Sequence, residues 1–255
     1  MKTIYDLKGK IALVTGASGG LGETFAHALA DSGAQVLVTA RREDAITQVA
    51  KDITDKGGIA HPVVMDVMDQ DSVAGAFDAA IELAGVPDVV VCNAGVAVTC
   101  PAIKLTKNDW DKVIGTNLTG CWHVNQEAAR RLIEHDKAGS IINISSILGQ
   151  RGAGAVLPYS VAKAGLDQMT RNLALEWARY SIRVNALSPG YIETPLNKDF
   201  FATDAGQAMI RRVPMRRLGQ ASELHASLLL MASDDSSFMT GHTMVVDGGH
   251  LQSSL

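Results

Sequence analysis

Short apolar runs alternate with helical patterns from one end of the chain to the other. The apolar runs are rich in Val and Ile and mostly lack polar alternation, as strands buried on both faces do. The predicted strands are Lys10–Thr15, Gln35–Thr39, Ala60–Met65, Asp88–Cys92, Ser140–Ser145, Arg183–Leu187 and Thr243–Val246. Alternation of strands and helices implies right-handed βαβ units, and therefore an α/β fold with a parallel sheet covered by helices on both faces.

Between these strands, apolar residues recur with the 3.6-residue period of a helix. The first stripe runs through Leu21–Leu29 and stops at Gly33, which we expect to be the C′ residue. Two longer helices are predicted over about Asn108–Glu134 and Pro158–Tyr180.

The organisation of the 255 residues favours one domain over the whole chain, 1–255, because no linker, repeat or low-complexity tract interrupts it. The irregular stretch 189–219 is the exception. A loop of this length in a compact domain is usually functional, so we expect an active-site lid. The alternative is a surface excursion with small helices of its own.

Composition excludes several kinds of partner. A net charge of −4 argues against nucleic acid, which needs a basic footprint. No apolar run approaches the roughly 20 residues of a membrane span, and the first ten residues lack the apolar core of a signal peptide. The three cysteines, Cys92, Cys100 and Cys121, form no CxxC pair, so we expect reduced thiols in a cytoplasm. The seven histidines show no metal-binding spacing, so no metal site is expected.

A glycine-rich segment follows the first strand and opens the first helix. Glycines there permit a tight turn and close approach of the backbone to a phosphate, and the helix N-terminus offers free N–H groups to a pyrophosphate. The candidate cofactor-binding residues are Gly16, Ala17, Ser18, Gly19, Gly20, Leu21 and Gly22. The alternative is an ordinary glycine-rich turn, but the strand–loop–helix context favours a dinucleotide site.

The end of the second strand indicates which dinucleotide binds. An acid there would bind the ribose 2′-hydroxyl, whereas arginine accommodates a 2′-phosphate. The acid's position is Ala40, and Arg41 and Arg42 follow it. We therefore predict NADP(H) rather than NAD(H); the alternative is that both arginines only solvate the next helix.

Three polar side chains indicate proton-transfer chemistry. Tyr159 and Lys163 are four residues apart, so they share one face of the predicted helix, on its apolar stripe. A phenol is a poor base unless a cation stabilises its phenolate, and an ammonium at about 4 Å offers roughly 4 kcal/mol at an effective dielectric near 20. Ser146, thirteen residues upstream of Tyr159, ends a predicted strand and is favoured over Ser145 as the hydroxyl that stabilises a developing charge.

With these elements, the chain resembles the short-chain dehydrogenase/reductase family over nearly its whole length. The matching segments are Thr15–Gly22, Asp66-Val67, Cys92-Asn93-Ala94-Gly95, Thr116-Asn117, Ser146, Tyr159-x-x-x-Lys163, Ser188–Thr194 and Val246–Gly249. Cys92 departs from the family's asparagine, but the three residues after it are intact.

The resemblance implies a catalytic tetrad of Asn117, Ser146, Tyr159 and Lys163. In the family the asparagine holds a water that relays protons to the lysine; the alternative is a structural asparagine. Further cofactor contacts are implied for Asp66, Val67, Asn93, Ala94, Gly95, Tyr159, Lys163, Pro189, Gly190, Ile192 and Thr194.

The resemblance also implies a single doubly wound, Rossmann-like domain of about seven parallel strands, usually assembled as a homotetramer, with a dimer as the alternative. It implies hydride transfer between NADP(H) and a carbonyl or secondary alcohol, with 3-oxoacyl thioesters as the leading substrates. Sugar or polyol ketones of the gluconate type, small xenobiotic ketones and an inactive cofactor-binding sensor are the alternatives. The pairs Arg211-Arg212 and Arg216-Arg217 are either a docking site for an acidic carrier or phosphorylated substrate, or a solvated face.

Overall fold

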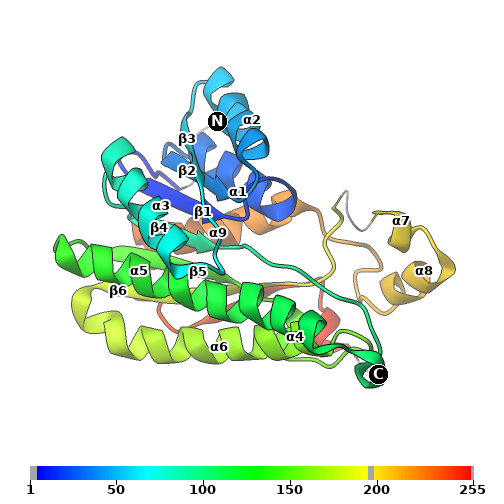
Figure 1. Cartoon of the computed structure of the whole chain (residues 1–255). Coiled ribbons are helices and arrows are strands. Elements are labelled where there is room, and N and C mark those ends of the chain that lie inside the picture. The colour runs from blue at the N-terminus through cyan, green and yellow to red at the C-terminus, as the bar shows by residue number, and fades with distance from the viewer. Residues whose placement is uncertain (1–4, 195–197, 254–255) are drawn as a thin grey trace.

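The computed structural model describes residues 5–194 and 198–253. In this part of the chain, seven parallel strands form one sheet in the order β3-β2-β1-β4-β5-β6-β7 (Figure 1). The strands are β1 (Ile11–Thr15), β2 (Gln35–Ala40), β3 (Ile59–Val64), β4 (Val89–Cys92), β5 (Gly139–Ile144), β6 (Ile182–Pro189) and β7 (Thr243–Val246). The predicted α/β class and doubly wound sheet are confirmed, and each strand boundary lies within two residues of the predicted one.

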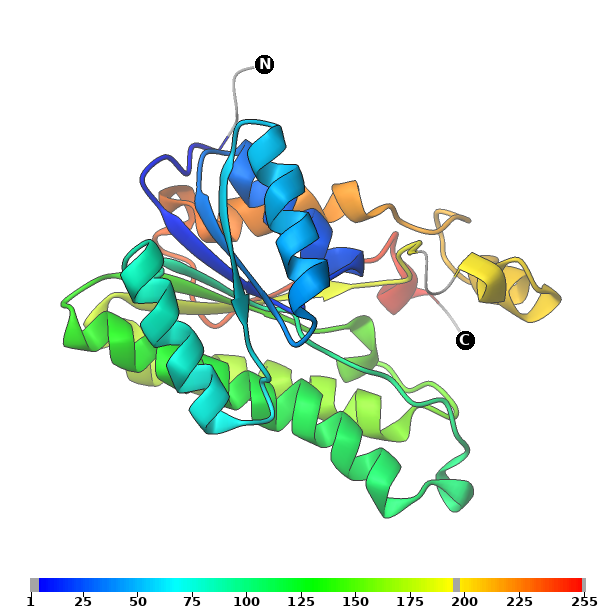
Figure 2. The same ribbon diagram turned by 45° about the horizontal axis from the view of Figure 1, so that its top comes forward.

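Helices cover both faces of this sheet. Those that line the cleft or pack on the sheet are α1 (Gly20–Asp31), α2 (Glu43–Asp55), α3 (Gln70–Leu83), α4 (Lys107–Ile114), α5 (Gly120–Glu134), α6 (Leu157–Trp177) and α9 (His225–Ala232). Figure 2 shows α5 and α6 on one side of the sheet and α1 with α9 on the other. Gly33 has a φ of +98° just after α1, as expected of a C′ residue.

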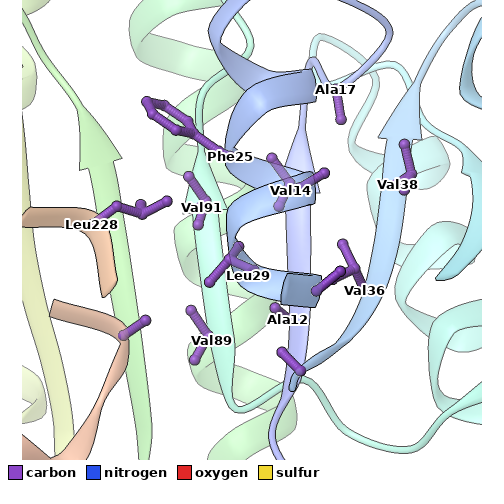
Figure 3. Packing of buried hydrophobic residues seen from close by; sticks show 14 of the residues in the cluster. Ala12, Val14, Ala17, Phe25, Leu29, Val36, Val38, Val89, Val91 and Leu228 are labelled. Carbon is purple, nitrogen blue, oxygen red and sulfur yellow. The ribbon is translucent and has the colours of Figure 1, made fainter. Parts of the chain in front are cut away.

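Successive strand residues enter two different cores. Ala12 and Val14 of β1 pack with Phe25 and Leu29 of α1, as Figure 3 shows, whereas Leu13 joins the core under α3, α5 and α6. All of these side chains are fully buried. Burial on both faces explains why the strands read as continuous apolar runs. The edge strand β3 departs from this pattern, because Ile59 and Val64 are about half exposed.

The predicted long helix over residues 108–134 is interrupted. A π-helical turn, Gly115–Thr119, separates α4 from α5. A glycine begins the turn and another follows it: a Cβ on Gly115 would lie 2.9 Å from the Met68 side chain, and one on Gly120 would lie 2.7 Å from Val67. The π-helical turn therefore lies where the segment after β3 approaches the helix closely. Such turns are frequent at functional sites.

The segment after β6 stands out from the end of the sheet in both views (Figures 1 and 2). It contains two short helices, α7 (Lys198–Phe201) and α8 (Asp204–Ile210), and Ile192 is bridged to Gly219 at its base. Residues 195–197 of the predicted lid, with Pro195, lie outside the described residues. No helix of the described chain is long and apolar enough to cross a membrane.

Candidate active site

A cleft of about 1010 Å³ lies beyond the carboxyl ends of the strands, where the strand order reverses between β1 and β4. The predicted site residues that line it are Gly16, Ser18, Gly19, Gly20, Leu21, Arg41, Arg42, Asp66, Val67, Asn93, Ala94, Gly95, Ser146, Tyr159, Lys163, Pro189, Gly190, Ile192 and Thr194. Ala17, Gly22 and Asn117 are buried behind this lining.

The glycine loop is held against the end of β4. The Asn93 side-chain amide donates to the carbonyls of Thr15 at 3.0 Å and Gly16 at 3.3 Å. The Thr15 hydroxyl accepts from the backbone amides of Asn93 and Ala94 at 2.9 and 3.0 Å. A Cβ on Gly22 would lie 2.4 Å from the Gly16 carbonyl oxygen, so the close packing requires glycine. Thr15 was not among the predicted site residues, although it begins the glycine-rich motif.

Two arginines stand at one end of the cleft. The Arg42 guanidinium donates to the carbonyl and the hydroxyl of Ser18 at 3.2 and 3.1 Å. A guanidinium nitrogen of Arg41 lies 4.0 Å from a carboxylate oxygen of Asp66. Both side chains line the cleft beside Ala40, where a carboxylate would otherwise stand. This end of the cleft can therefore bind an anionic oxygen group.

Tyr159 and Lys163 lie on α6 and face the same cleft. The Lys163 side chain is 4% exposed, and its Nζ donates to the Ile144 carbonyl at 2.6 Å. The same Nζ lies 5.5 Å from the centre of the Tyr159 ring. The helix thus buries an ammonium beside a phenol at the end of β5.

Ser146 is the next residue but one after β5, and its hydroxyl accepts from the Leu148 amide at 3.2 Å. Ser145 is buried, and its hydroxyl donates to the Lys163 carbonyl at 3.4 Å. Burial raises the pKa of the neighbouring Asp167 carboxyl, and Ser145 and the charges of Arg171 and Lys163 lie close enough to oppose that rise. Ser145 therefore has structural partners.

Asn117 lies in the π-helical turn and is 1% exposed. Its side chain bonds to both backbone polar groups of Val96, which lines the cleft after β4. The side chain is thus engaged with the protein itself, and the water relay implied by the resemblance stays a prediction.

One cleft residue, Tyr191, was not among the predicted site residues. Tyr191 lines the cleft directly after Gly190, and its ring centre lies 5.1 Å from that of His250. A lone aromatic residue between predicted cofactor contacts was the only sequence signal for it.

One of the predicted basic pairs has a partner within the protein. Arg217 forms a bidentate ion pair with Glu223, and this pair, together with a backbone hydrogen bond, lowers the pKa of the Glu223 carboxyl to about 2. Within residues 5–194 and 198–253, no three His, Cys, Asp or Glu side chains gather as a metal site would require.

The chain matches known proteins over nearly its full length. Residues 16–250 match the family model described as Enoyl-(Acyl carrier protein) reductase. A 3-oxoacyl-[acyl-carrier-protein] reductase of Thermotoga maritima is 34% identical over 243 residues, which cover 95% of this chain and 98% of the relative.

Two solved structures are similar in fold and sequence. A short-chain type dehydrogenase/reductase from Mycobacterium marinum has a TM-score of 0.91 and 38% identity, with 96% of each chain covered. A gluconate 5-dehydrogenase from Burkholderia cenocepacia, in complex with NADP and tartrate, has a TM-score of 0.94 and 34% identity, with 98% of each chain covered.

The fold and the cleft define an α/β oxidoreductase that acts on alcohol and carbonyl groups. The chain belongs to the short-chain dehydrogenase/reductase family.

Proposed function

We propose that this protein is an NADP(H)-dependent oxidoreductase that interconverts a carbonyl compound and a secondary alcohol. The observation that carries the proposal is one cleft that has Ser146, Tyr159 and Lys163 along its lining and two arginines at its other end. The NADP complex of the gluconate 5-dehydrogenase from Burkholderia cenocepacia supports the choice of cofactor.

The residues present fit this cofactor. Gly16 has a φ of +66°, and a Cβ there would lie 2.7 Å from Ala94, so the loop brings bare backbone to the cleft surface. Arg41, Arg42 and the Ser18 hydroxyl supply donors suited to a 2′-phosphate. When bound, the dinucleotide supplies or accepts the hydride.

The proton comes from this chain's own residues. Tyr159 gives its phenolic proton to the carbonyl oxygen in reduction, and its phenolate takes the proton back in oxidation. Lys163 stabilises the phenolate by its charge and is suited to hold ribose hydroxyls. Ser146 donates a hydrogen bond to the reacting oxygen as negative charge develops there. Asn117 secures the loop that carries Val96 and supports this arrangement from behind.

Several predictions about the whole molecule belong to the same proposal. Residues 1–255 form one catalytic domain, in which 189–219 closes over the substrate, and the protein works in the cytoplasm. Homotetramers, or dimers, are supported by apolar side chains that α6 leaves exposed, such as Leu175, which is 82% exposed. Light scattering on the purified protein checks the assembly.

The substrate is a ketone or its alcohol. A 3-oxoacyl thioester is supported by the relative from Thermotoga maritima, and a gluconate-type sugar acid by the neighbour from Burkholderia cenocepacia. A panel assay with NADPH decides between them; it includes acetoacetyl thioesters, sugar ketones and small xenobiotic ketones. Oxidation of NADPH with at least one ketone supports the proposal. Tight NADPH binding without turnover on any ketone contradicts it and favours an inactive sensor.

A further inference from the structure

Four loops meet at the carboxyl end of the sheet on the side of β5, β6 and β7. Arg151 follows the 3-10 turn after Ser146, Tyr191 follows β6, and His250 follows β7. Arg212 follows α8 in the segment that stands out from the sheet. Tyr191 belongs to the lining of the cleft, so this group of residues adjoins the end of the cleft that is opposite the two arginines after β2.

Direct contacts join three members of the group. The ring centre of Tyr191 lies 5.1 Å from that of His250 and 5.6 Å from that of Phe201. The Arg151 guanidinium donates to the His250 carbonyl, and to the Ser253 hydroxyl at 2.9 Å. The His250 side chain is 5% exposed, and its Nδ1 has no hydrogen-bond partner among the described residues.

The fourth member, Arg212, belongs to a segment that packs on the loop after β7: the Met215 amide donates to the Gly248 carbonyl at 3.3 Å, and a Cβ on Gly249 would lie 3.2 Å from Pro214. Burial raises the pKa of the Tyr191 phenol, and the positive charges of Arg151 and Arg212 oppose the rise. Burial lowers the pKa of the His250 imidazole, and the same two guanidinium groups lower it further. The segments that carry these two guanidinium groups thus pack around Tyr191 and His250 at the end of the cleft, and neither arginine is itself part of the cleft lining.

No described acid neutralises these two charges by direct pairing. Neither guanidinium takes part in an ion pair between described residues. The carboxylate of Asp247 favours the charged form of His250, but its two oxygens accept from the backbone amides of Gly249 at 2.8 Å and Leu251 at 2.6 Å. Two guanidinium groups without an ion-pair partner among the described residues therefore stand next to this end of the cleft, against the single carboxylate of Asp247.

We infer that the substrate carries an anionic oxygen group, a carboxylate in the first place, which Arg151 and Arg212 bind beside Tyr191. This inference rests on the proposed function and narrows its substrate class. A guanidinium matches the planar geometry of a carboxylate with paired donors, and a cleft of one charge sign concentrates the opposite ion. The carboxylate of a hydroxy acid or oxo acid can pair with these guanidinium groups, whereas the short acyl chain of a 3-oxoacyl thioester has no anionic group for them to bind.

The test compares matched substrates on the full chain. 4-Oxopentanoate and its methyl ester are reduced with NADPH, and gluconate and glucitol are oxidised with NADP⁺. Each pair differs only in the carboxylate. We expect the kcat/KM of the acid to exceed that of its neutral partner by at least about tenfold, as loss of one charge-assisted contact typically costs. Glucitol 6-phosphate distinguishes a phosphate site: if it alone is preferred, the carboxylate assignment is wrong.

Variants assign the preference to the two arginines. Arg151→Gln and Arg212→Gln should each reduce the preference for the acid, mainly by raising its KM. Arg211→Gln, next to Arg212 in the sequence, is the matched control and should keep the wild-type preference. Because Arg151 also ties down the segment around His250, its substitution could unfold the protein. Arg212→Gln then decides alone.

The outcomes separate this inference from the function on which it rests. If wild type reduces the ester as efficiently as the acid, or if both arginine variants keep the full preference, the anion site is wrong while the oxidoreductase stands. If no ketone of either kind oxidises NADPH, the proposed function itself fails.

Discussion

Asn117 holds the backbone of Val96 from both sides: its Oδ1 accepts from the Val96 amide and its Nδ2 donates to the Val96 carbonyl, each at 2.8 Å. Val96 lines the cleft just after Asn93-Ala94-Gly95. The bonds tie this cleft loop to the π-helical turn between α4 and α5. Asn117, from the helical layer on one face of the sheet, thereby fixes the loop that follows the carboxyl end of β4.

Asn117→Ala should therefore loosen the cleft and destabilise the protein. It leaves the two part-buried backbone groups of Val96 without these partners, and loss of one such hydrogen bond typically costs about 0.5–1.5 kcal/mol. Urea unfolding measures the loss, and the KM for NADPH reports the loosened loop. Asn172→Ala is the control, because that amide is exposed and bonds only to Gln168 among the described side chains. We expect the control to lie within about 0.5 kcal/mol of wild type. Equal stability of both variants would show that the bonds to Val96 contribute little.

Gly22→Ala should disrupt the cofactor loop. The added Cβ would lie 2.4 Å from the Gly16 carbonyl oxygen and 2.5 Å from the Asn93 amide nitrogen, both parts of the loop's own support. Overpacking of this kind costs about 1–3 kcal/mol, so we expect NADPH binding to weaken by roughly tenfold or more. Fluorescence titration measures it.

Gly75→Ala is the matched control for that variant. Gly75 lies inside α3, and a Cβ there meets nothing within 4 Å. Alanine should stabilise the helix by about 0.5–1 kcal/mol and leave NADPH binding unchanged. A Gly22→Ala protein that binds NADPH as tightly as the control would contradict the account of the loop.

Arg42→Ala should remove most of the preference for NADPH. Loss of a charge-assisted hydrogen bond costs about 1.5–3 kcal/mol, which corresponds to roughly a 10–100-fold fall in kcat/KM for NADPH. Activity with NADH should hardly change, because NADH lacks the 2′-phosphate. Arg179→Ala is the control, since that arginine stacks on Tyr180 and is not part of the cleft lining. An equal loss with both cofactors would mean that Arg42 acts on the fold and not on the phosphate.

Asp167→Asn should change how stability depends on pH. Burial raises the pKa of this carboxyl, so the folded protein holds its proton more tightly than the unfolded chain does. Wild-type stability therefore falls as pH rises from the ordinary aspartate value of about 3.9 through the higher folded pKa. Asparagine cannot ionise, so the variant should gain stability relative to wild type between about pH 4 and pH 8.

Urea unfolding midpoints at about pH 4 and pH 8 measure this gain in stability, with Asp136→Asn as the control. Asp136 is exposed and has a φ of 50°, a conformation that asparagine tolerates. The control should follow the wild-type profile. The reasoning about burial is wrong if Asp167→Asn does so too.

Sequence periodicity was sufficient for the fold, because the central strands are buried on both faces and their runs are mostly apolar. It did not predict the π-helical turn at Gly115–Thr119, which lies where Gly115 and Gly120 approach Met68 and Val67, far away in the chain. Local residue pattern cannot report such a contact.

The residues of the candidate site likewise differ in how far the sequence could predict them. The pair Tyr159 and Lys163 could be predicted because helical spacing alone brings the two side chains together. The contacts of Tyr191 with Phe201 and His250 could not, because loops after different strands create them. The hydrogen-bond partners of Asn117 likewise depend on the position in space of the loop after β4.

The central claim is that Tyr159 transfers the proton in the reaction, and Tyr159→Phe tests it most directly. Tyr180→Phe, which alters an exposed phenol beyond α6, serves as the control. The measurement is the single-turnover rate of NADPH oxidation with the best ketone of the panel, beside the Kd for NADPH. The account predicts a fall in rate of about 10²–10⁴-fold with an unchanged Kd. Retention of more than about a tenth of the wild-type rate would contradict it.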